Sequence, residues 1–311
     1  MPARLRVGVL RGGPGRGEMA DRSYAASLAS GQSVLTHLPP TYQADDILIT
    51  RDGQWHGGGL PVAPPTAAGR VDIFFNALHG GYGEDGKIQQ TLESLGLPYT
   101  GSGILASASG MFKPLAKEAF RRASLRTPAG LTLSAEDGLP VELARRVFLR
   151  LGPPWVVKPA GGSFSTGVFT ARRLPELALA VDQCLALTNT VLVERQLHGP
   201  EATVVVVENF RGRDYYPFLP IETKSRACPG CFSSAIKDEL GRVAVAAHRA
   251  LGFRHYSSID LVVEPNGVYV LEANSLPALG PDSLLAQSLP ALGCSMNLFL
   301  DHIVNLARLG R

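Results

Sequence analysis

The chain has 311 residues, of which 45% are hydrophobic and 18% charged, and its formal net charge is +3. This length and apolar content predict a globular protein of two or three domains, each with its own core. The small charge, the absence of a dense Lys/Arg block and the short apolar runs argue against nucleic-acid and membrane partners and against a signal peptide, so a cytoplasmic protein is expected.

The first third of the chain alternates apolar strands with glycine-rich turns. Residues 5–10 predict a strand that runs into the glycine-rich segment 11–15, and a helix is expected from about Ser23. This order is typical of the start of an α/β domain, although the glycines do not form a G-x-G-x-x-G motif. Further strands are predicted at 47–49 and 71–76, with a surface loop over 57–65.

Residues 77–86 (ALHGGYGEDG) separate a strand from a helix that is expected to begin near Lys87. The glycines and His79 could turn backbone N–H groups and the helix N-terminus toward an anion. An equally good interpretation is a tight turn in which Glu84 and Asp85 cap the helix.

The middle of the chain contains a strand, residues 155–159, that carries Lys158 and leads into a Gly/Ser loop at 160–167. Such a loop can enclose phosphates with its backbone N–H groups, but it could equally be a flexible hairpin loop beside a snorkelling lysine. The other predicted elements are helices at 116–123, 142–151, 238–251, 282–289 and 297–307, and strands at 191–194 and 201–207.

Residues 257–274 predict two apolar strands joined by a three-residue loop, Pro265-Asn266-Gly267. This loop would place Asp260 opposite Glu272, with Asn274 on the same face as Glu272. Two neighbouring acids repel each other unless a cation lies between them, and these oxygen donors suit Mg²⁺. The alternative is an ordinary hairpin with solvated acids.

Cys228 and Cys231 have the C-x-x-C spacing. A structural zinc site would need a second pair of ligands, which the sequence lacks. A redox pair and two free thiols both remain open, and free thiols are favoured in a reducing compartment.

Several short segments occur in an order that identifies a family. They are residues 75–80 (FNALHG), 83–86 (GEDG), 98–103 (PYTGSG), 157–159 (VKP), 199–201 (GPE), 259–260 (ID) and 271–274 (LEAN). Over nearly its whole length, the chain resembles the D-alanine–D-alanine ligase family of the ATP-grasp superfamily.

The resemblance implies an α/β (α+β ATP-grasp) fold in three parts. These are an N-terminal Rossmann-like domain (1–103), a central ATP-grasp subdomain (104–190) and a C-terminal subdomain with the metal site (191–311), the last two with antiparallel sheets. The implied reaction joins a carboxylate to an amine through an acyl phosphate, with D-alanyl-D-alanine for peptidoglycan precursor synthesis as the expected product. Amino acids are then the expected partners, and a homodimer is left open.

The resemblance also implies roles for individual residues, with ATP and Mg²⁺ (or Mn²⁺) as cofactors. Lys113, Lys158, Ser163, Ser165, Glu194, Arg195, Leu197 and Glu201 would bind ATP, with Lys158 also catalytic. Asp260, Glu272 and Asn274 would hold the metal. His79, Ser283 and Leu284 would bind substrate.

The sequence departs from the family mainly on the amino-acid side. Glu18, the candidate for the catalytic glutamate that binds the substrate amine, is out of register with the family motif. Phe164 replaces the serine of the Gly/Ser loop, and Ser258 replaces an arginine that stabilises the oxyanion. Arg254 could substitute for that arginine if its strand extends far enough back.

The segment that forms a flexible lid in the family is reduced here to residues 221–227, without a tyrosine. Lys224 and Arg226 in this segment could reach phosphate. Because the ATP and metal residues are kept, we expect an active ligase. The alternatives are a ligase for a different amino or hydroxy acid and an ATP-binding protein without activity.

Overall fold

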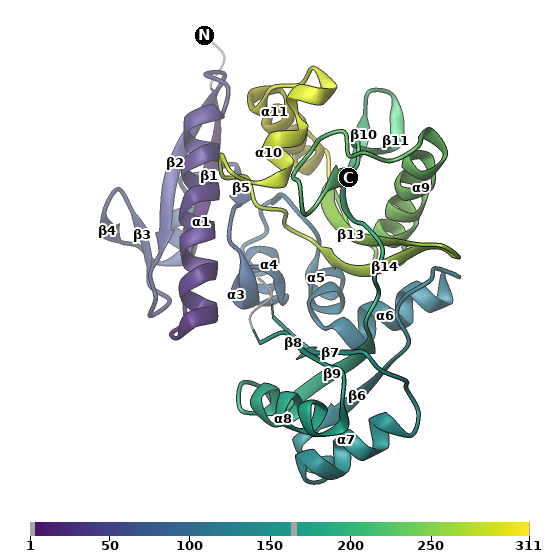
Figure 1. Cartoon of the computed structure of the whole chain (residues 1–311). Helices are drawn as coiled ribbons and strands as arrows, with labels where there is room; N and C mark the ends of the chain where they lie inside the picture. The colour runs from purple at the N-terminus through teal and green to yellow at the C-terminus, as the bar shows by residue number, and fades with distance from the viewer. Residues whose placement is uncertain (1–3, 163–166, 311) are drawn as a thin grey trace.

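The N-terminal region is built on a five-stranded sheet in the order β4-β3-β2-β1-β5 (Figure 1). Its strands are β1 (Leu5–Gly12), β2 (Tyr42–Ile49), β3 (Trp55–Gly57), β4 (Leu60–Pro61) and β5 (Ile73–Asn76). The computed structural model describes residues 4–162 and 167–310 of the chain. Strand β1 pairs in parallel with β2 and β5. The segment 57–65, which was predicted to be a loop, contains part of the β3–β4 hairpin. Trp55 of β3 is buried and packs edge-on against Phe74.

The helices of this region differ slightly from the predicted ones. They are α1 (Glu18–His37), α2 (Pro64–Ala68), α3 (Gly80–Glu84) and α4 (Lys87–Ser94). Helix α1 begins five residues before the predicted start at Ser23. Glu18 and Asp21 lie in its first turn, where negative charges stabilise the helix by interacting with its dipole. Of the two acids expected to cap the helix near Lys87, Asp85 accepts a hydrogen bond from Lys87 N at the start of α4, whereas Glu84 accepts from Gly80 N at the start of α3.

The central region is an antiparallel sheet in the order β6-β9-β7-β8, with two helices packed against it. Its elements are β6 (Gly130–Ser134), a short 3-10 helix (Ala135–Asp137), α7 (Pro140–Phe148), β7 (Trp155–Pro159), β8 (Phe169–Ala171), α8 (Leu174–Leu185) and β9 (Thr190–Arg195). Trp155 and Val157 alternate with outward-facing positions along β7 and bury their side chains against α7 and α8.

The third region is an antiparallel sheet in the order β11-β10-β13-β14, with β12 also paired to β10. Its strands are β10 (Glu201–Phe210), β11 (Arg213–Pro217), β12 (Ile221–Glu222), β13 (Tyr256–Glu264) and β14 (Gly267–Asn274). The helices of this part are α9 (Ser234–Ala250), α10 (Leu284–Ser288), a 3-10 helix (Pro290–Leu292) and α11 (Met296–Arg308).

Both faces of strand β10 are covered. Val205 and Val207 pack into a core shared with β1, β5 and α11, whereas Val204 and Val206 pack against α9 on the other face. Because side chains of a strand alternate between faces, the continuous apolar run of β10 serves two cores. The N-terminal sheet and the third sheet are therefore joined into one platform, with the central region below it in Figure 1.

The packing places one segment differently from the predicted division at residue 103. Helices α5 (Ile104–Met111) and α6 (Lys113–Arg122) contact β14, and Ala116 and Phe120 of α6 lie in the core of the third sheet. The central sheet itself begins at Gly130 and includes β9. Within the described residues, no helix is long and apolar enough to cross a membrane.

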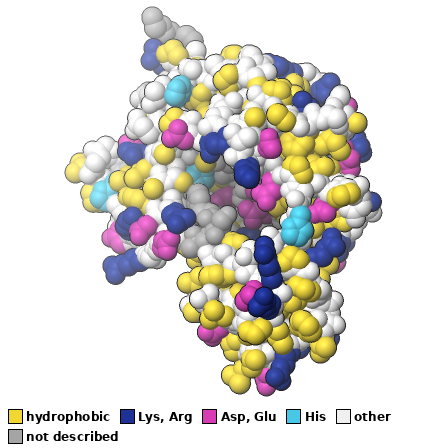
Figure 2. All heavy atoms as spheres, in the orientation of Figure 1, with side chains coloured by type: hydrophobic (Ala, Val, Ile, Leu, Met, Phe, Trp, Pro, Cys, Tyr) yellow, Lys and Arg dark blue, Asp and Glu magenta, His cyan; other side chains and the backbone are white. Residues whose placement is uncertain are grey.

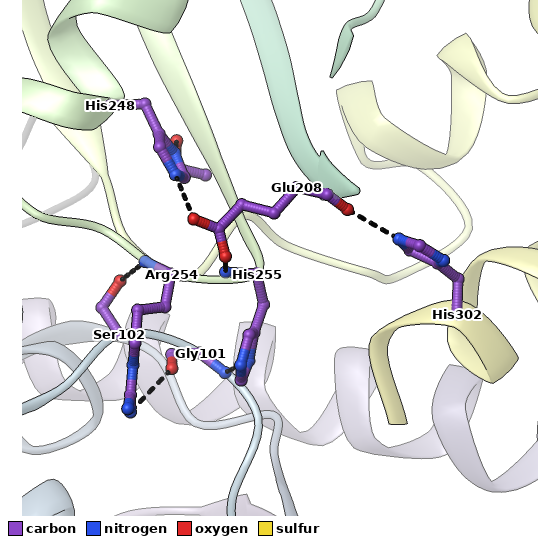
Figure 3. A network of polar contacts seen from close by, with 8 residues as sticks. Gly101, Ser102, Glu208, His248, Arg254, His255 and His302 are labelled. Carbon is purple, nitrogen blue, oxygen red and sulfur yellow. Dashed lines mark hydrogen bonds and ion pairs between the residues drawn. The ribbon is translucent and has the colours of Figure 1, made fainter. Parts of the chain in front are cut away.

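A network of polar contacts centred on Glu208 of β10 connects the platform (Figure 3). The Glu208 carboxylate accepts a hydrogen bond from His255 N at 2.6 Å and lies 3.6 Å from Nε2 of the buried His248. His302 of α11 contacts the Glu208 carbonyl at 2.7 Å. Gly101 N donates to the His255 ring at 3.0 Å, which extends the network to the N-terminal region.

Glu208→Gln should destabilise the fold. Burial alone would raise the pKa of Glu208, but the His248 ring and the N–H of His255 outweigh it and lower the pKa. The charged form therefore stabilises the native state above the ordinary pKa of glutamate, and this stabilisation is lost as the pH falls through the lower folded-state pKa. We expect a loss of about 1–3 kcal/mol at pH 7 by urea denaturation, and a smaller loss near pH 3. Asp214→Asn, at an exposed position of β11, is the control; an equal loss in both variants would contradict the role of Glu208.

Candidate active site

The β13–β14 ribbon places two acids opposite each other, and the predicted pairing of Asp260 with Glu272 is confirmed. The turn and the strand register next to it, which produce this pairing, differ from the predicted ones. Glu264 pairs with Gly267, so the turn has two residues instead of three, and this register alone would bring Leu271 opposite Asp260. An irregularity after Asp260, at which Leu271 is the extra residue, shifts the pairing by one and restores Glu272 to that position.

Asp260 is half-buried, and burial together with the nearby Glu272 raises its pKa to about 7. Thr203, which pairs with Asp260 across β10 and β13, donates a hydrogen bond to the Asp260 carboxylate at 2.6 Å. Lys113 Nζ lies 3.7 Å from the Glu272 carboxylate. The nearby Glu272 disfavours the charge on Asp260, and a bound cation would relieve this repulsion.

The donor set around these acids fits a magnesium ion. Asp260, Glu272 and Asn274 line one cavity and offer carboxylate and amide oxygens, which are the ligands that Mg²⁺ prefers. Across residues 4–162 and 167–310, no group of three His, Cys, Asp or Glu side chains could hold a metal ion. A cation on this ribbon would be held by the two acids and the Asn274 amide, and phosphate or water oxygens would complete its coordination.

A cavity of about 400 Å³ lies between the central sheet and the β13–β14 ribbon. Figure 2 shows acidic side chains recessed near the middle of this face, with Lys and Arg side chains around them. The cavity wall combines lysines, which can neutralise phosphate, with apolar and backbone positions from both sheets. It is lined by residues including Lys113, Lys158, Val168, Glu194, Arg195, Gln196, Leu197, Glu201, Asp260, Leu271 and Glu272.

Glu194 sits in this wall between two lysines. Its carboxylate oxygens lie 2.7 Å from Lys117 Nζ and 2.7 Å from Lys158 Nζ. Burial would raise the pKa of Glu194, but the two lysines reverse the effect and lower it. Burial lowers the pKa of Lys117 to about 8, so this lysine is still mostly protonated at neutral pH. This ion cluster fixes the Glu194 and Lys158 side chains in the wall of the cavity.

A second cavity, of about 410 Å³, lies on the other side of the acids. Asp260 and Glu272 line both cavities, so molecules bound in the two would meet at this pair. His79 in the wall is buried and contacts Ser30 Oγ at 2.7 Å, and burial lowers its pKa to about 4, so its ring is neutral. The lining also includes Glu84, Thr203, Arg226, Ser258, Asn274, Ala278, Asp282, Ser283 and Leu284.

Most of the predicted site residues lie in these two cavities. The first cavity contains Lys113, Lys158, Glu194, Arg195, Leu197 and Glu201, together with both acids. The second contains His79, Asn274, Ser283 and Leu284, again with both acids. Ser163 and Ser165 lie outside the described residues.

Two predicted catalytic residues are not brought to either cavity. Strand β13 begins only at Tyr256, and Arg254 turns away from the ribbon. Its N–H donates to Ser102 and its guanidinium donates to the Gly101 carbonyl (Figure 3). The guanidinium also stacks on Tyr99. Glu18 is exposed in the first turn of α1, where it pairs with Arg22. We therefore correct both expectations and assign neither residue a contact with substrate.

Three residues that were not predicted to belong to the site lie in or beside it, namely Lys117, Thr203 and Glu84. Lys117 follows Lys113 by four residues, a spacing that puts both on one face of α6, and this signal could have found it. Thr203 was detectable only through strand pairing. Glu84 was expected only to cap a helix, yet it also lines the second cavity.

The comparisons with known proteins agree with this geometry. Family models described as "D-ala D-ala ligase C-terminus" and "D-ala D-ala ligase N-terminus" match residues 128–305 and 60–102. A protein named D-alanine–D-alanine ligase from Desulforudis audaxviator is 35% identical over 320 residues, covering 97% of this chain and 98% of its own. One of the same name from Cupriavidus necator is 32% identical, covering 98% and 92%.

The chain belongs to the D-alanine–D-alanine ligase family. The predicted family, the ATP-grasp fold, the class of ADP-forming ligase and the use of ATP and Mg²⁺ are thereby confirmed.

Solved structures of the family superpose closely on the chain. The D-alanine–D-alanine ligase from Bacillus anthracis complexed with ATP gives a TM-score of 0.80 at 25% identity, covering 99% of each chain. The VanG D-Ala:D-Ser ligase from Enterococcus faecalis gives 0.86 at 21% identity, covering 98% of this chain and 100% of that one, which shows the shared fold.

Asp260 should make metal binding pH-dependent. Because its folded-state pKa is raised to about 7, protons compete with Mg²⁺ below that pH. Without metal, the native state binds more protons than the unfolded state between the two pKa values, so Asp260 costs stability as the pH rises through this window. We expect the melting temperature of metal-free Asp260→Asn to exceed that of the wild type increasingly from about pH 4 to pH 8. A constant difference over that range would contradict the raised pKa.

Proposed function

We propose that the protein joins two D-alanine molecules into D-alanyl-D-alanine for peptidoglycan precursor synthesis, with release of ADP and phosphate. The observation that carries this proposal is the meeting of two cavities at Asp260 and Glu272. One cavity is lined by the lysines that a triphosphate requires, and the other is large enough for small amino acids. The relatives named D-alanine–D-alanine ligase support the choice of substrate.

In this proposal the first cavity positions ATP for phosphoryl transfer. Lys113 and Lys158 neutralise the phosphates, while Glu201 and the segment 194–197 contact the nucleoside. The ion cluster of Lys117, Glu194 and Lys158 holds these groups in place before ATP binds, so that little reorganisation is needed.

The chemistry takes place where the cavities meet. The carboxylate of one amino acid attacks the γ-phosphorus of ATP, the bond to the ADP oxygen breaks, and an acyl phosphate forms. The amine of the second amino acid then displaces phosphate and loses a proton. Mg²⁺ held by Asp260, Glu272 and Asn274 would offset the charge on the phosphate oxygens when it is bound.

The substrate side also supports a second candidate, a ligase for a different amino or hydroxy acid. Ser258 lines the second cavity where the family has an arginine, and Glu18 is not part of the lining of that cavity. Both changes alter contacts to the amino acids and leave the lysine-lined cavity intact. The division into three domains, the cytoplasmic location and a homodimer remain predictions.

The assay that tests this function is ADP release with D-alanine, L-alanine and a panel of other amino and hydroxy acids. We expect turnover with D-alanine, none with L-alanine, and ligated product by mass spectrometry. Turnover only with another acid would select the second candidate. Binding of ATP without turnover on any acid would favour a protein that only binds the nucleotide.

Glu272→Gln should reduce kcat by about 100-fold or more, because it removes a charge facing the phosphates and the metal. Glu264→Gln is the matched control, since it makes the same change on the same ribbon, and Glu264 lines neither cavity among the described residues. Near-normal kcat in Glu272→Gln would refute the assigned role of this acid.

A further inference from the structure

Lys117 is buried behind the wall of the first cavity and is not part of its lining. It lies on α6, four residues after Lys113, and its Nζ is 2.7 Å from the Glu194 carboxylate of β9. The same nitrogen donates to the Val270 carbonyl of β14 at 3.4 Å. Lys117 therefore connects α6 with the central sheet and with the β13–β14 ribbon, in a place that ATP does not reach.

The charges that line the first cavity do not favour a triphosphate by themselves. The described part of the lining has three cations and four acids, namely Lys113, Lys158 and Arg195 against Glu194, Glu201, Asp260 and Glu272. Lys224 and Arg226, which were expected to reach phosphate, do not line this cavity. A metal ion held by Asp260 and Glu272 would offset those two acids. Glu194 has no such ion beside it.

Glu194 would cancel the charge of Lys158 if these two groups were alone. One of its carboxylate oxygens is 2.7 Å from Lys158 Nζ, and both side chains are buried. Water and salt screen the charges of buried groups poorly. A phosphate that approached this pair would be attracted by the lysine and repelled by the carboxylate at nearly the same distance.

Lys117 supplies the positive charge that this pair lacks. Its ammonium is mostly protonated at neutral pH, because its pKa remains near 8 despite burial. Together Lys117, Lys158 and Glu194 carry one net positive charge, whereas Lys158 and Glu194 alone would carry none. The wall can therefore keep an acid next to a lysine that binds phosphate.

We propose that Lys117 sets the net charge of the nucleotide cavity: it neutralises Glu194 from behind the wall and leaves the charge of Lys158 to attract the triphosphate. Lys117 is then a positioning residue that acts through Glu194 and Lys158 without touching ATP. The inference rests on the part of the proposed function that places ATP in the first cavity. It does not depend on which amino acids are joined.

The test compares the dissociation constants of ATP and AMP, measured by titration calorimetry at one pH, ionic strength and Mg²⁺ concentration. These ligands share the nucleoside, so the ratio of Kd for AMP to Kd for ATP reports the attraction of the two outer phosphates. In Lys117→Met we expect this ratio to fall about tenfold or more, because ATP loses affinity while AMP changes little.

Arg122→Met is the matched control. It removes a cation from the same helix, but the Arg122 side chain is exposed and pairs with Glu118. Its charge is screened by water and salt, so the ratio should stay within about twofold of the wild type. A fall in this variant as large as that in Lys117→Met would overturn the proposal, because any cation on α6 would then have the same effect.

A double variant separates the balance of charge from direct attraction. Lys117→Met combined with Glu194→Gln removes both charges and leaves that of Lys158, so the ratio should return to within about threefold of the wild type. Any contact between residue 194 and the nucleoside is common to AMP and ATP and does not alter the ratio. If Lys117 attracted the phosphates directly, the double variant would keep the low ratio of Lys117→Met, and the proposal would be wrong.

A purely structural role of Lys117 gives a different result. If Lys117 only fastens α6 to the central sheet, Lys117→Met will lower the melting temperature and weaken AMP and ATP equally, with the ratio unchanged; this would also overturn the proposal. Because the single variant leaves Glu194 with one partner, it can fail to fold. Glu194→Gln alone then decides: it leaves two cations in the cluster, so its ratio should exceed that of the wild type, and an equal or lower ratio would contradict the proposal.

These measurements need no turnover, so the outcome can be distinguished from failure of the ligase function. A wild type that joins no amino acids, combined with the expected ratios, would reject the ligase function and support the role of Lys117. Formation of D-alanyl-D-alanine combined with an unchanged ratio in Lys117→Met would reject that role and leave the function standing. A wild type that binds neither nucleotide would reject both.

Discussion

The architecture of the site depends on the placement of Asp260 and Glu272 directly opposite each other on one ribbon. Burial and the neighbouring Glu272 carboxylate make the charged form of Asp260 energetically unfavourable, and the pKa of Asp260 is raised as a consequence. The fold supplies one hydrogen-bond donor, Thr203, and one lysine, Lys113, at 3.7 Å. These contacts do not neutralise two acids in full. The pair therefore creates a demand for a cation at the point where nucleotide and amino acid meet.

The two acids can bind a cation together only if the backbone of the ribbon holds them opposite each other. Strand β10 provides this rigidity, since Val205 and Val206 on its opposite faces are buried in two different cores. At its far end, Glu208 binds the segment that precedes β13, and through His255 it is connected to Gly101 of the N-terminal region. The ribbon is thus held by neighbours from distant parts of the sequence. Packing, rather than local propensity, fixes the geometry at the reaction centre.

Sequence reasoning could predict the strands, most helices and the opposition of Asp260 and Glu272, because these follow from periodicity, turn residues and family motifs. The predicted register was correct although the turn was wrong, since the displacement at Leu271 compensated for a shorter loop. Such a displacement depends on packing that one sequence does not reveal. The same limit explains Arg254, which was expected on β13. His255 takes a left-handed φ of 64°, so the chain turns before the strand begins and directs Arg254 to another region.

The positively charged side chains of the two cavities come from different kinds of structural element. On the nucleotide side, Lys113 and Lys158 come from the first turn of α6 and from the core strand β7, so their positions are set by regular structure. On the amino-acid side, the Lys or Arg side chain among the described lining residues is Arg226 of the segment 223–227, which donates to the Asp282 carbonyl and the Gln287 side chain. Surface segments can change length and sequence with less cost to the fold than buried strands. The lysines of the nucleotide side are therefore fixed by regular structure, whereas the cation of the amino-acid side lies on a short surface segment.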